Sequence, residues 1–136
     1  MWLFTKDGFY SAVAHRDDPD LLVVRARSRI DLQWLIRNHG LTAEIVDTPV
    51  GSDYPCRIIV PRGAWAEVVR TEALDITYGN FKSEVNVVIG PEREDVYHRV
   101  WAVLLAVEKE PGAVAERNTP SPKAKKKTRL GKGKKK

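Results

Sequence analysis

The sequence predicts an α+β domain in which helices cover an antiparallel sheet of about five strands, followed by a disordered basic tail. Three observations predict this architecture. Short β-rich runs separated by turn residues fill the start of the chain. Helical apolar spacing then alternates with two more strand runs, which gives the order β-β-β-α-β-β-α-α and admits a permuted ferredoxin-like arrangement. Residues 111–136 have too few large apolar side chains for a core, so we expect the compact domain to span residues 1–110.

The start of the chain predicts three strands joined by two tight turns. Residues 2–5 and 9–15 are rich in aromatic and apolar side chains. The Asp-Gly pair between them is typical of a hairpin whose glycine has a positive φ. The acidic, proline-containing segment 16–20 predicts a second turn, which leads into a third strand over residues 21–24.

A helix is expected over residues 29–38. Ser28 is a favourable N-cap, and Gly40 is a typical stop signal. Asp31 lies at the reciprocal position of a capping box, although its side chain is one methylene shorter than the preferred glutamate.

Two further strands are expected, over residues 43–47 and 56–60, and Pro61 then precedes a second helix. The spacing of apolar residues predicts one buried face on this helix. Its members are Trp65, Val68, Val69, Ala73 and Ile76.

The end of the domain contains one ambiguous segment and one clear helix. Residues 83–89 fit either a strand or a short helix capped by Asn80. The last helix begins at Pro91 and has an apolar stripe flanked by Tyr97 and Trp101. The stripe consists of Val96, Val100, Val103, Leu104 and Val107.

Charge is distributed unevenly along the 136 residues. Lys and Arg number 23 and Asp and Glu 18, a net charge of +5 at pH 7. Residues 111–136 hold ten basic side chains and one acidic one, whereas residues 1–110 have a net charge of −4. An acidic body therefore carries a basic tail.

The basic tail predicts binding to nucleic acid. Counterion release attracts a polycation to phosphate backbones without base specificity, so DNA and RNA are not distinguished. Five to eight phosphate contacts would give a log–log salt slope of about −4.5 to −7 on duplex DNA. Alternatives are a solubility tail, a nuclear-import signal in a eukaryote, or an anionic membrane, although no second membrane anchor is evident. The candidate nucleic-acid-binding residues are Lys123, Lys125, Lys126, Lys127, Arg129, Lys132, Lys134, Lys135 and Lys136.

Composition argues against several other classes of protein. The length suits one domain rather than a large multidomain enzyme. No apolar run is long enough for a membrane-spanning helix, and the opening residues lack the features of a signal peptide. Cys56 is the only cysteine, which excludes an intramolecular disulfide and favours a reducing compartment. We therefore expect a cytoplasmic protein without a membrane partner.

No motif predicts a catalytic site, a metal or a cofactor. His15, His39 and His98 lack metal-ligand spacing; His39 is interpreted as a cation at a helix C-terminus and His98 as part of an exposed helix face. The acidic turn over residues 16–20 lacks the glycine and the distant glutamate of a calcium loop. Cys56 lies in an apolar strand, which favours a buried, inert thiol.

Residues 6–13 are partly similar to the aromatic strand of an RNA-recognition sheet. The continuation that such a strand requires is absent, so core packing of Phe9 or Tyr10 is the favoured interpretation.

Ile30, Trp34 and Arg37 form a candidate partner contact. Ile30 and Trp34 share a helix face almost opposite the main apolar one, with Arg37 close by. Burial between the sheet and another helix is favoured, because a small α+β domain needs its tryptophans inside. Exposure as an anchor for a protein partner is the alternative.

Several short motifs resemble those of a family of small bacterial and bacteriophage proteins. The motifs are Met1-Trp2-Leu3-Phe4-Thr5 with Gly8-Phe9-Tyr10-Ser11, Asp53-Tyr54-Pro55, Asn80-Phe81-Lys82 and Tyr97-x-x-Val-Trp101. The resemblance covers most of residues 1–105 and implies a prokaryotic or phage cytosolic protein. It implies no activity, because that family has no established catalytic or binding residues. The lysine-rich tail is an addition to the pattern.

Together these observations predict a non-enzymatic accessory protein that is tethered to nucleic acid by its tail while its body contacts another protein. An alternative is a phage-type effector whose body binds and inhibits a host protein. A hydrolase or nuclease that uses scattered carboxylates and His98 is a third hypothesis. The sequence does not define the oligomeric state.

Overall fold

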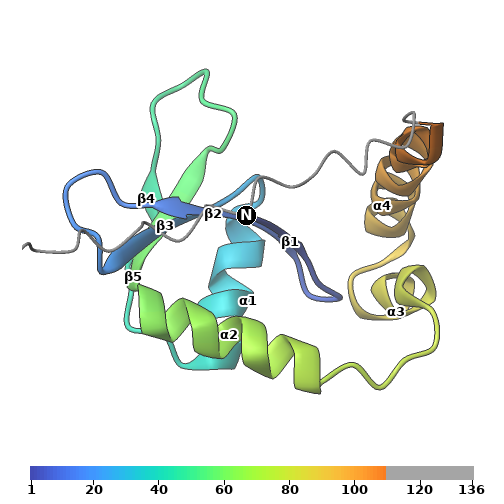
Figure 1. The fold of residues 1–136 in the computed structure, drawn as a ribbon, viewed down its shortest axis with the longest axis horizontal. Coiled ribbons are helices and arrows are strands. Elements are labelled where there is room, and N and C mark those ends of the chain that lie inside the picture. The colour runs from blue at the N-terminus through green and yellow to red at the C-terminus, as the bar shows by residue number, and fades with distance from the viewer. Residues whose placement is uncertain (110–136) are drawn as a thin grey trace, which may run out of the picture. The chain divides into compact units, whose positions relative to one another are not determined.

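The computed structural model describes residues 1–109, and the chain divides into two compact units, Met1–Val103 and Leu104–Lys136. Among the described residues, the first unit contains a five-stranded antiparallel sheet and four helices (Figure 1), which confirms the predicted α+β class. The described part of the second unit is the short 3-10 helix η1 (Leu105–Lys109). The other elements, in chain order, are β1 (Trp2–Phe4), β2 (Phe9–Ala14), β3 (Leu21–Ala26), α1 (Arg29–His39), β4 (Val46–Asp47), β5 (Cys56–Pro61), α2 (Arg62–Leu74), α3 (Phe81–Val88) and α4 (Pro91–Leu104).

The strand order β1-β2-β3-β5-β4 matches the permuted ferredoxin-like arrangement. β5 lies between β3 and β4 and is antiparallel to both, so β3, α1 and β4 form a split β-α-β unit. α2 follows β5, and β2 takes the place beside β3 that the last strand of an unpermuted fold would occupy. β1 adds one more antiparallel strand beside β2.

The lengths of β3 and β4 differ from the prediction by more than one residue, whereas β1, β2 and β5 each differ by one. β3 continues to Ala26 because its whole length pairs with β5, where Ala26 lies opposite Cys56. The strand predicted over residues 43–47 is reduced to β4. Ala43 and Ile45 pack against the core without joining the sheet.

The predicted hairpin between β1 and β2 is present, but the prediction of a positive φ at Gly8 is wrong. The described glycines with positive φ lie elsewhere in the chain. The turn is held instead by Thr5, whose Oγ1 accepts hydrogen bonds from the backbone N–H groups of Asp7 (3.2 Å) and Gly8 (3.1 Å). Gly8 is needed for space, because a Cβ there would lie 2.6 Å from Tyr10 Oη.

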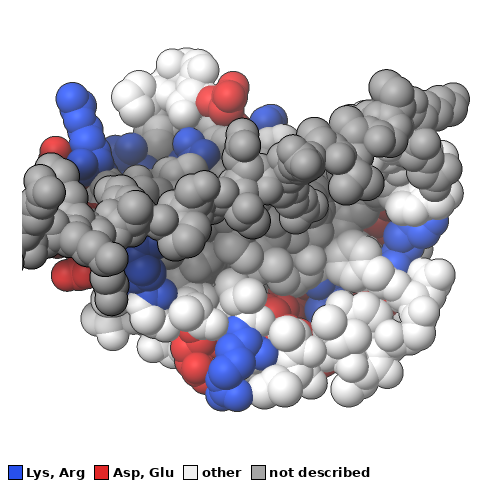
Figure 2. Space-filling view, in the orientation of Figure 1, with Lys and Arg blue, Asp and Glu red and all other residues white. Residues whose placement is uncertain are grey.

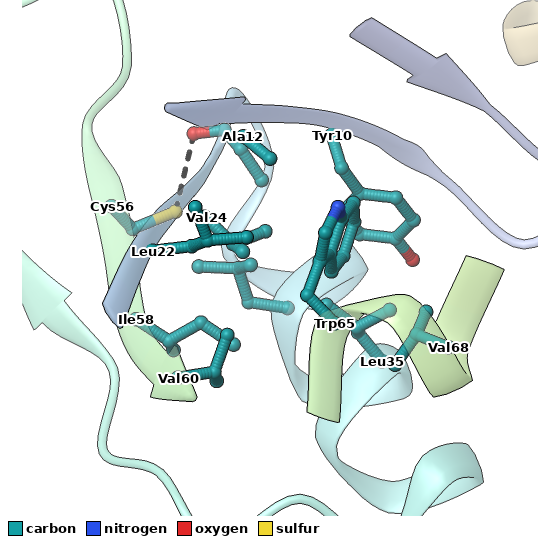
Figure 3. Packing of buried hydrophobic residues seen from close by; sticks show 12 residues of the cluster. Tyr10, Ala12, Leu22, Val24, Leu35, Cys56, Ile58, Val60, Trp65 and Val68 are labelled. Atoms are coloured by element: carbon teal, nitrogen blue, oxygen red, sulfur yellow. Dashed lines mark hydrogen bonds between the residues drawn. The ribbon is translucent and has the colours of Figure 1, made fainter. Parts of the chain in front are cut away.

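The core lies between one face of the sheet and the helices α1 and α2. Tyr10 of β2 and Trp65 of α2 meet edge to face with ring centroids 6.3 Å apart. Figure 3 shows these rings side by side, with Leu35 and Val68 of the two helices close to them. Removing this apolar surface from water is the main stabilising contribution to the fold. The buried cluster consists of Tyr10, Ala12, Leu22, Val24, Ala26, Leu32, Leu35, Cys56, Ile58, Val60, Trp65 and Val68.

α1 has nearly the predicted bounds, but the predicted capping box is wrong. Ser28 is the N-cap, yet its side chain makes no capping hydrogen bond. Asp31 bonds to the backbone of Phe9 and to Arg93 instead. Gly40 ends the helix with a φ of 59°, as predicted.

The buried face of α2 is shorter than predicted. Trp65 and Val68 are buried, and Val69 packs against the core. The helix ends at Leu74, so Ile76 lies beyond it and is exposed; Ala73 is exposed as well.

The ambiguous residues 83–89 form a helix, not a strand, over most of their length. Asn80 caps α3 as that interpretation requires, because its Oδ1 accepts a hydrogen bond from the backbone N–H of Ser83 at 3.0 Å.

The predicted apolar stripe of α4 is not the buried face of that helix. Tyr97 is 5% exposed, whereas Val96 is 46% and Val103 is 73% exposed. The Tyr97 ring stacks on Phe81 of α3 at 5.7 Å and meets Phe4 of β1 edge to face at 5.2 Å. Aromatic contacts therefore set the rotation of α4 about its axis.

Candidate functional site

The sheet face opposite the core carries arginines and aromatic rings. Side chains alternate along a strand, so residues between the buried ones point to this second face. The register aligns one row of such side chains across four strands: Trp2 of β1, Ser11 of β2, Arg25 of β3 and Arg57 of β5. We refer to this surface as the open sheet face.

The loop between β4 and β5 positions a tyrosine at the open sheet face. The backbone oxygen of Tyr54 accepts hydrogen bonds from Thr48 Oγ1 at 2.5 Å and from Ser52 Oγ at 3.2 Å. These bonds fix the end of the loop just before β5 begins. Tyr54 is only 7% exposed, because its ring packs beneath neighbouring side chains.

Tyr54 supports two arginines. The guanidinium carbons of Arg25 and Arg27 lie 4.6 and 5.2 Å from its ring centroid, which is within the range of a cation–π contact. Arg25 Nη2 also donates a hydrogen bond to Ser11 Oγ at 2.8 Å. Among the described residues, neither these arginines nor Arg57 forms an ion pair. The open sheet face therefore carries positive charge that no described carboxylate neutralises.

A groove of about 550 Å³ lies between the open sheet face and α4. Three aromatic rings line it from the strands: Phe4 and Phe9 stack at 4.5 Å, and Trp2 meets Phe9 edge to face at 5.9 Å. Val96 and Val100 line it from α4. The rest of the lining consists of Arg27, Ser28, Asp31, Tyr54, Arg93 and Tyr97.

An ion pair fixes α4 to the first turn of α1 beside this groove. Arg93 Nη1 and Nη2 donate to Asp31 Oδ2 and Oδ1 at 2.8 and 2.9 Å, a bidentate arrangement. The backbone N–H of Phe9 donates to Asp31 Oδ2 at 3.1 Å. These three bonds compensate the burial of the Asp31 carboxylate, whose side chain is 6% exposed. The bonds to Asp31 also hold the pKa of Arg93 above its usual range.

The charge of the open sheet face differs from that of the body as a whole. Figure 2 shows Lys and Arg side chains at the left of the view with Asp and Glu side chains near them, and both kinds together over α2. On the open sheet face itself, Arg25, Arg27 and Arg57 form no ion pair with a described carboxylate. α2 carries the exposed ion pair between Glu67 and Arg70. The net charge of −4 over residues 1–110 thus conceals a local excess of positive charge.

The predicted partner-contact residues lie at the surface. Ile30 is 60% and Trp34 is 48% exposed, so the favoured interpretation that both are buried is wrong. The guanidinium carbon of Arg37 lies 5.7 Å from the Trp34 ring centroid. Ile30 and Trp34 also line a second cavity, of about 340 Å³, together with Val88 and Ile89 at the end of α3.

The predicted burial of the Cys56 thiol is confirmed. Its Sγ donates a hydrogen bond to the backbone oxygen of Ala26 at 3.4 Å, and burial raises the pKa of the thiol.

His39, at the C-terminal end of α1, also links this helix to α2, because its Nε2 lies 2.8 Å from Glu72 Oε1. His98 is exposed on α4, as predicted.

The acidic segment between β2 and β3 is a turn, as predicted. The backbone N–H of Asp20 donates to Asp18 Oδ1 at 2.9 Å, while Asp17 is exposed.

Within residues 1–109, no group of three His, Cys, Asp or Glu side chains is placed to hold a metal ion. None of the helices in this part of the chain combines the length and apolar character needed to cross a bilayer.

Sequence analysis missed most of the groove. Core packing was expected for Phe9 or Tyr10; Tyr10 is in the core, whereas Phe9 lines the groove on the other face. The spacing of two between Arg25 in β3 and Arg27 just beyond its end is the signal that puts both side chains on one face. The role of Tyr54 had no signal of this kind, because it lies in a loop.

The nine candidate tail residues lie outside the residues that the structure describes. They are Lys123, Lys125, Lys126, Lys127, Arg129, Lys132, Lys134, Lys135 and Lys136.

No protein-family model matches the chain, and no match is found among curated proteins or solved structures.

Proposed function

We propose that this protein is a small, non-enzymatic accessory protein of prokaryotic or phage origin that binds nucleic acid in the cytoplasm. The tail cations supply attachment to phosphates without base specificity. The observation that supports a role of the body is the positive charge of the open sheet face. Arg25, Arg27 and Arg57 form no ion pair with a described residue, and the exposed ring of Trp2 lies on the same face of the sheet.

Arginine suits this role for two physical reasons. A guanidinium group binds phosphate through two N–H donors, and it stays charged at every pH of interest. The contacts with Tyr54 also orient Arg25 and Arg27 before a ligand arrives, which reduces the side-chain entropy lost on binding. A tail that is already attached to a nucleic acid raises the local concentration of phosphates at the body.

A salt series on labelled duplex DNA and RNA tests the role of the tail. The full chain should bind with a log–log slope of about −4.5 to −7 on DNA, and a chain ending at Pro122 should lose most of the affinity and most of the slope. The core lies within residues 1–103, and near-ultraviolet circular dichroism would check that the shortened chain is folded. Equal slopes for the two chains, or no binding of the full chain at low salt, would contradict the proposal.

Charge removal on the full-length chain tests the open sheet face. Arg57→Gln should weaken binding and reduce the slope by about one contact. Arg70→Gln is the matched control, because Arg70 is also exposed to solvent but lies on α2 in a pair with Glu67. An equal effect of the two substitutions would indicate that only total charge matters.

Contact with another protein is a second candidate function, favoured by the exposure of Ile30 and Trp34. It includes the alternative of a phage-type effector that binds and inhibits a host protein. Under this hypothesis Trp34→Ala should abolish binding to a partner while nucleic-acid binding and stability persist. If Trp34→Ala leaves partner binding intact, the contact lies elsewhere.

A further inference from the structure

We propose that the groove between the open sheet face and α4 binds an unpaired base of single-stranded nucleic acid. The inference rests on the proposed function, because it concerns which nucleic acid the protein prefers. In this arrangement the rings of the groove contact the base, and the arginines of the open sheet face contact the neighbouring phosphates.

The groove has the shape and lining that a flat aromatic ring requires. Trp2 is 68% exposed and stands edge to face with Phe9, so both rings offer surface to a ligand. Val96 and Val100 supply apolar surface from α4, which would remove a bound base from water. The volume of about 550 Å³ is in the range of sites that hold small-molecule ligands.

The polar groups of the groove complement a ligand rich in hydrogen-bond acceptors. Arg27 lines the groove and is held by Tyr54 without an acidic partner among the described residues. Ser28 makes no capping hydrogen bond with its side chain, and it too lines the groove. The acidic group in the lining is Asp31, whose charge Arg93 neutralises through two hydrogen bonds. The groove therefore presents donors without an unpaired negative charge.

The geometry favours a single strand over a duplex. A base in a duplex is paired and stacked on both sides, so it must leave the helix before it can enter the groove, at a cost of a few kcal/mol. An unpaired base has no such cost. Base–ring stacking also depends little on base identity, which is consistent with the sequence-independent attachment expected of the tail.

Charge favours a nucleic acid over an apolar peptide as the occupant. An aliphatic side chain of a peptide would also fill a space lined by Trp2 and Phe9. It would leave the positive charge of Arg25, Arg27 and Arg57 on the same face uncompensated, whereas phosphates on either side of a base would compensate it.

The test uses the full-length chain and a short unstructured strand that carries the fluorescent base 2-aminopurine. The emission of this base falls when it stacks on an aromatic ring. The same sequence as a duplex is the comparison probe. Affinities are measured at low salt and again near 200 mM salt, where the contribution of the tail to affinity is much smaller.

Two matched pairs of variants distinguish the contribution of the groove to single-strand binding from the contributions of the rest of α4 and of the tail. Val96→Glu places a carboxylate in the groove, and Val103→Glu places the same charge on α4 outside it; both valines are exposed, so both variants should fold. Trp2→Leu removes a ring from the groove, and Trp101→Leu removes an exposed ring that does not line it. We expect Val96→Glu and Trp2→Leu to weaken single-strand binding about 5- to 150-fold, equivalent to the loss of one base–ring stack. The two controls should have little effect, and duplex binding should change little in every variant.

The outcomes distinguish this inference from the proposed function. Equal losses for Val96→Glu and Val103→Glu, or unchanged 2-aminopurine emission on binding, would overturn the assignment of the groove. Tail-dependent duplex binding would then still support the proposed function. A full chain that binds neither probe would overturn both.

Discussion

The ion pair between Asp31 and Arg93 offers a direct way to perturb the groove. It joins the first turn of α1 to α4, next to the rings that line the groove, and its two residues are 62 positions apart in the chain. We expect Asp31→Ala and Arg93→Ala each to destabilise the protein and to weaken single-strand binding, because either change releases α4 from its place beside the sheet.

The magnitude follows from the burial of the two partners. Removing one member of a fully buried pair costs about 3–5 kcal/mol. The Asp31 side chain is 6% exposed and that of Arg93 is 22% exposed, so solvent partly compensates Arg93. We therefore expect Arg93→Ala to lower the free energy of unfolding by about 2–3 kcal/mol, because it leaves the Asp31 carboxylate with only the Phe9 N–H. Asp31→Ala should cost about 1–2 kcal/mol, because the freed guanidinium can reach water.

Urea denaturation of the two single variants and the double variant measures the coupling between the partners. We expect a coupling energy near 2 kcal/mol with an unchanged denaturant slope. Arg70→Ala is the control, since its pair with Glu67 lies in solvent and its loss should leave the midpoint unchanged. A coupling energy below about 0.5 kcal/mol would refute the reasoning that this ion pair holds α4 in place.

Three further outcomes test the core and the surface by the same denaturation assay. Gly8→Ala should lower the free energy of unfolding by about 1–3 kcal/mol, because the new methyl group would overlap the buried Tyr10 hydroxyl. An unchanged free energy of unfolding would mean that the turn can accommodate a Cβ atom at this position. Trp65→Ala should lower the free energy of unfolding by about 3–5 kcal/mol, and Trp34→Ala by less than about 1 kcal/mol. Similar losses for the two variants would contradict the burial of Trp65 and the exposure of Trp34. The raised pKa of Cys56 means that the unfolded chain loses its thiol proton first as pH rises. Stability should therefore fall above about pH 8.5, by up to about 1.4 kcal/mol per pH unit, and this part of the pH dependence should be missing in Cys56→Ala.

The sheet could be predicted because its strands and turns carry local signals. The β-rich runs of β2, β3 and β5, the turn residues near them and the stop at Gly40 each act within a few positions. The hairpin at Gly8 shows where local reasoning is incomplete. The turn was predicted correctly, but the glycine is required by the distant Tyr10 hydroxyl rather than by its own φ.

The helices show a stronger dependence on contacts between distant residues. Asp31 has the position of a capping residue, yet Arg93 and Phe9 provide better partners for its carboxylate. In α4 the valines have the spacing of a buried stripe, but the described structure offers Tyr97 aromatic partners instead. Which face of a helix is buried therefore depends on its neighbours as well as on its own periodicity.

The open sheet face was partly within reach of the sequence. The spacing of two between Arg25 in β3 and Arg27 just beyond its end places both on one side of the strand. The apolar neighbours Val24 and Ala26 indicate that the other side is buried. The support from Tyr54 depends on how a loop returns to the sheet, and nothing in the local pattern encodes that path.

The pairing of β3 with β5 has a consequence for how the chain folds. β1, β2 and β3 pair through short turns, so these contacts are local and form at a small cost in loop entropy. β5 must instead return across about 30 residues that include α1 and β4, since Ala26 pairs with Cys56. Bringing distant segments together is the slow part of folding in small domains. We therefore expect formation of the β3–β5 register to be the rate-limiting step, with its contacts already present in the transition state for folding. A smaller side chain at Ile58 should then slow folding more than a change in α4 does.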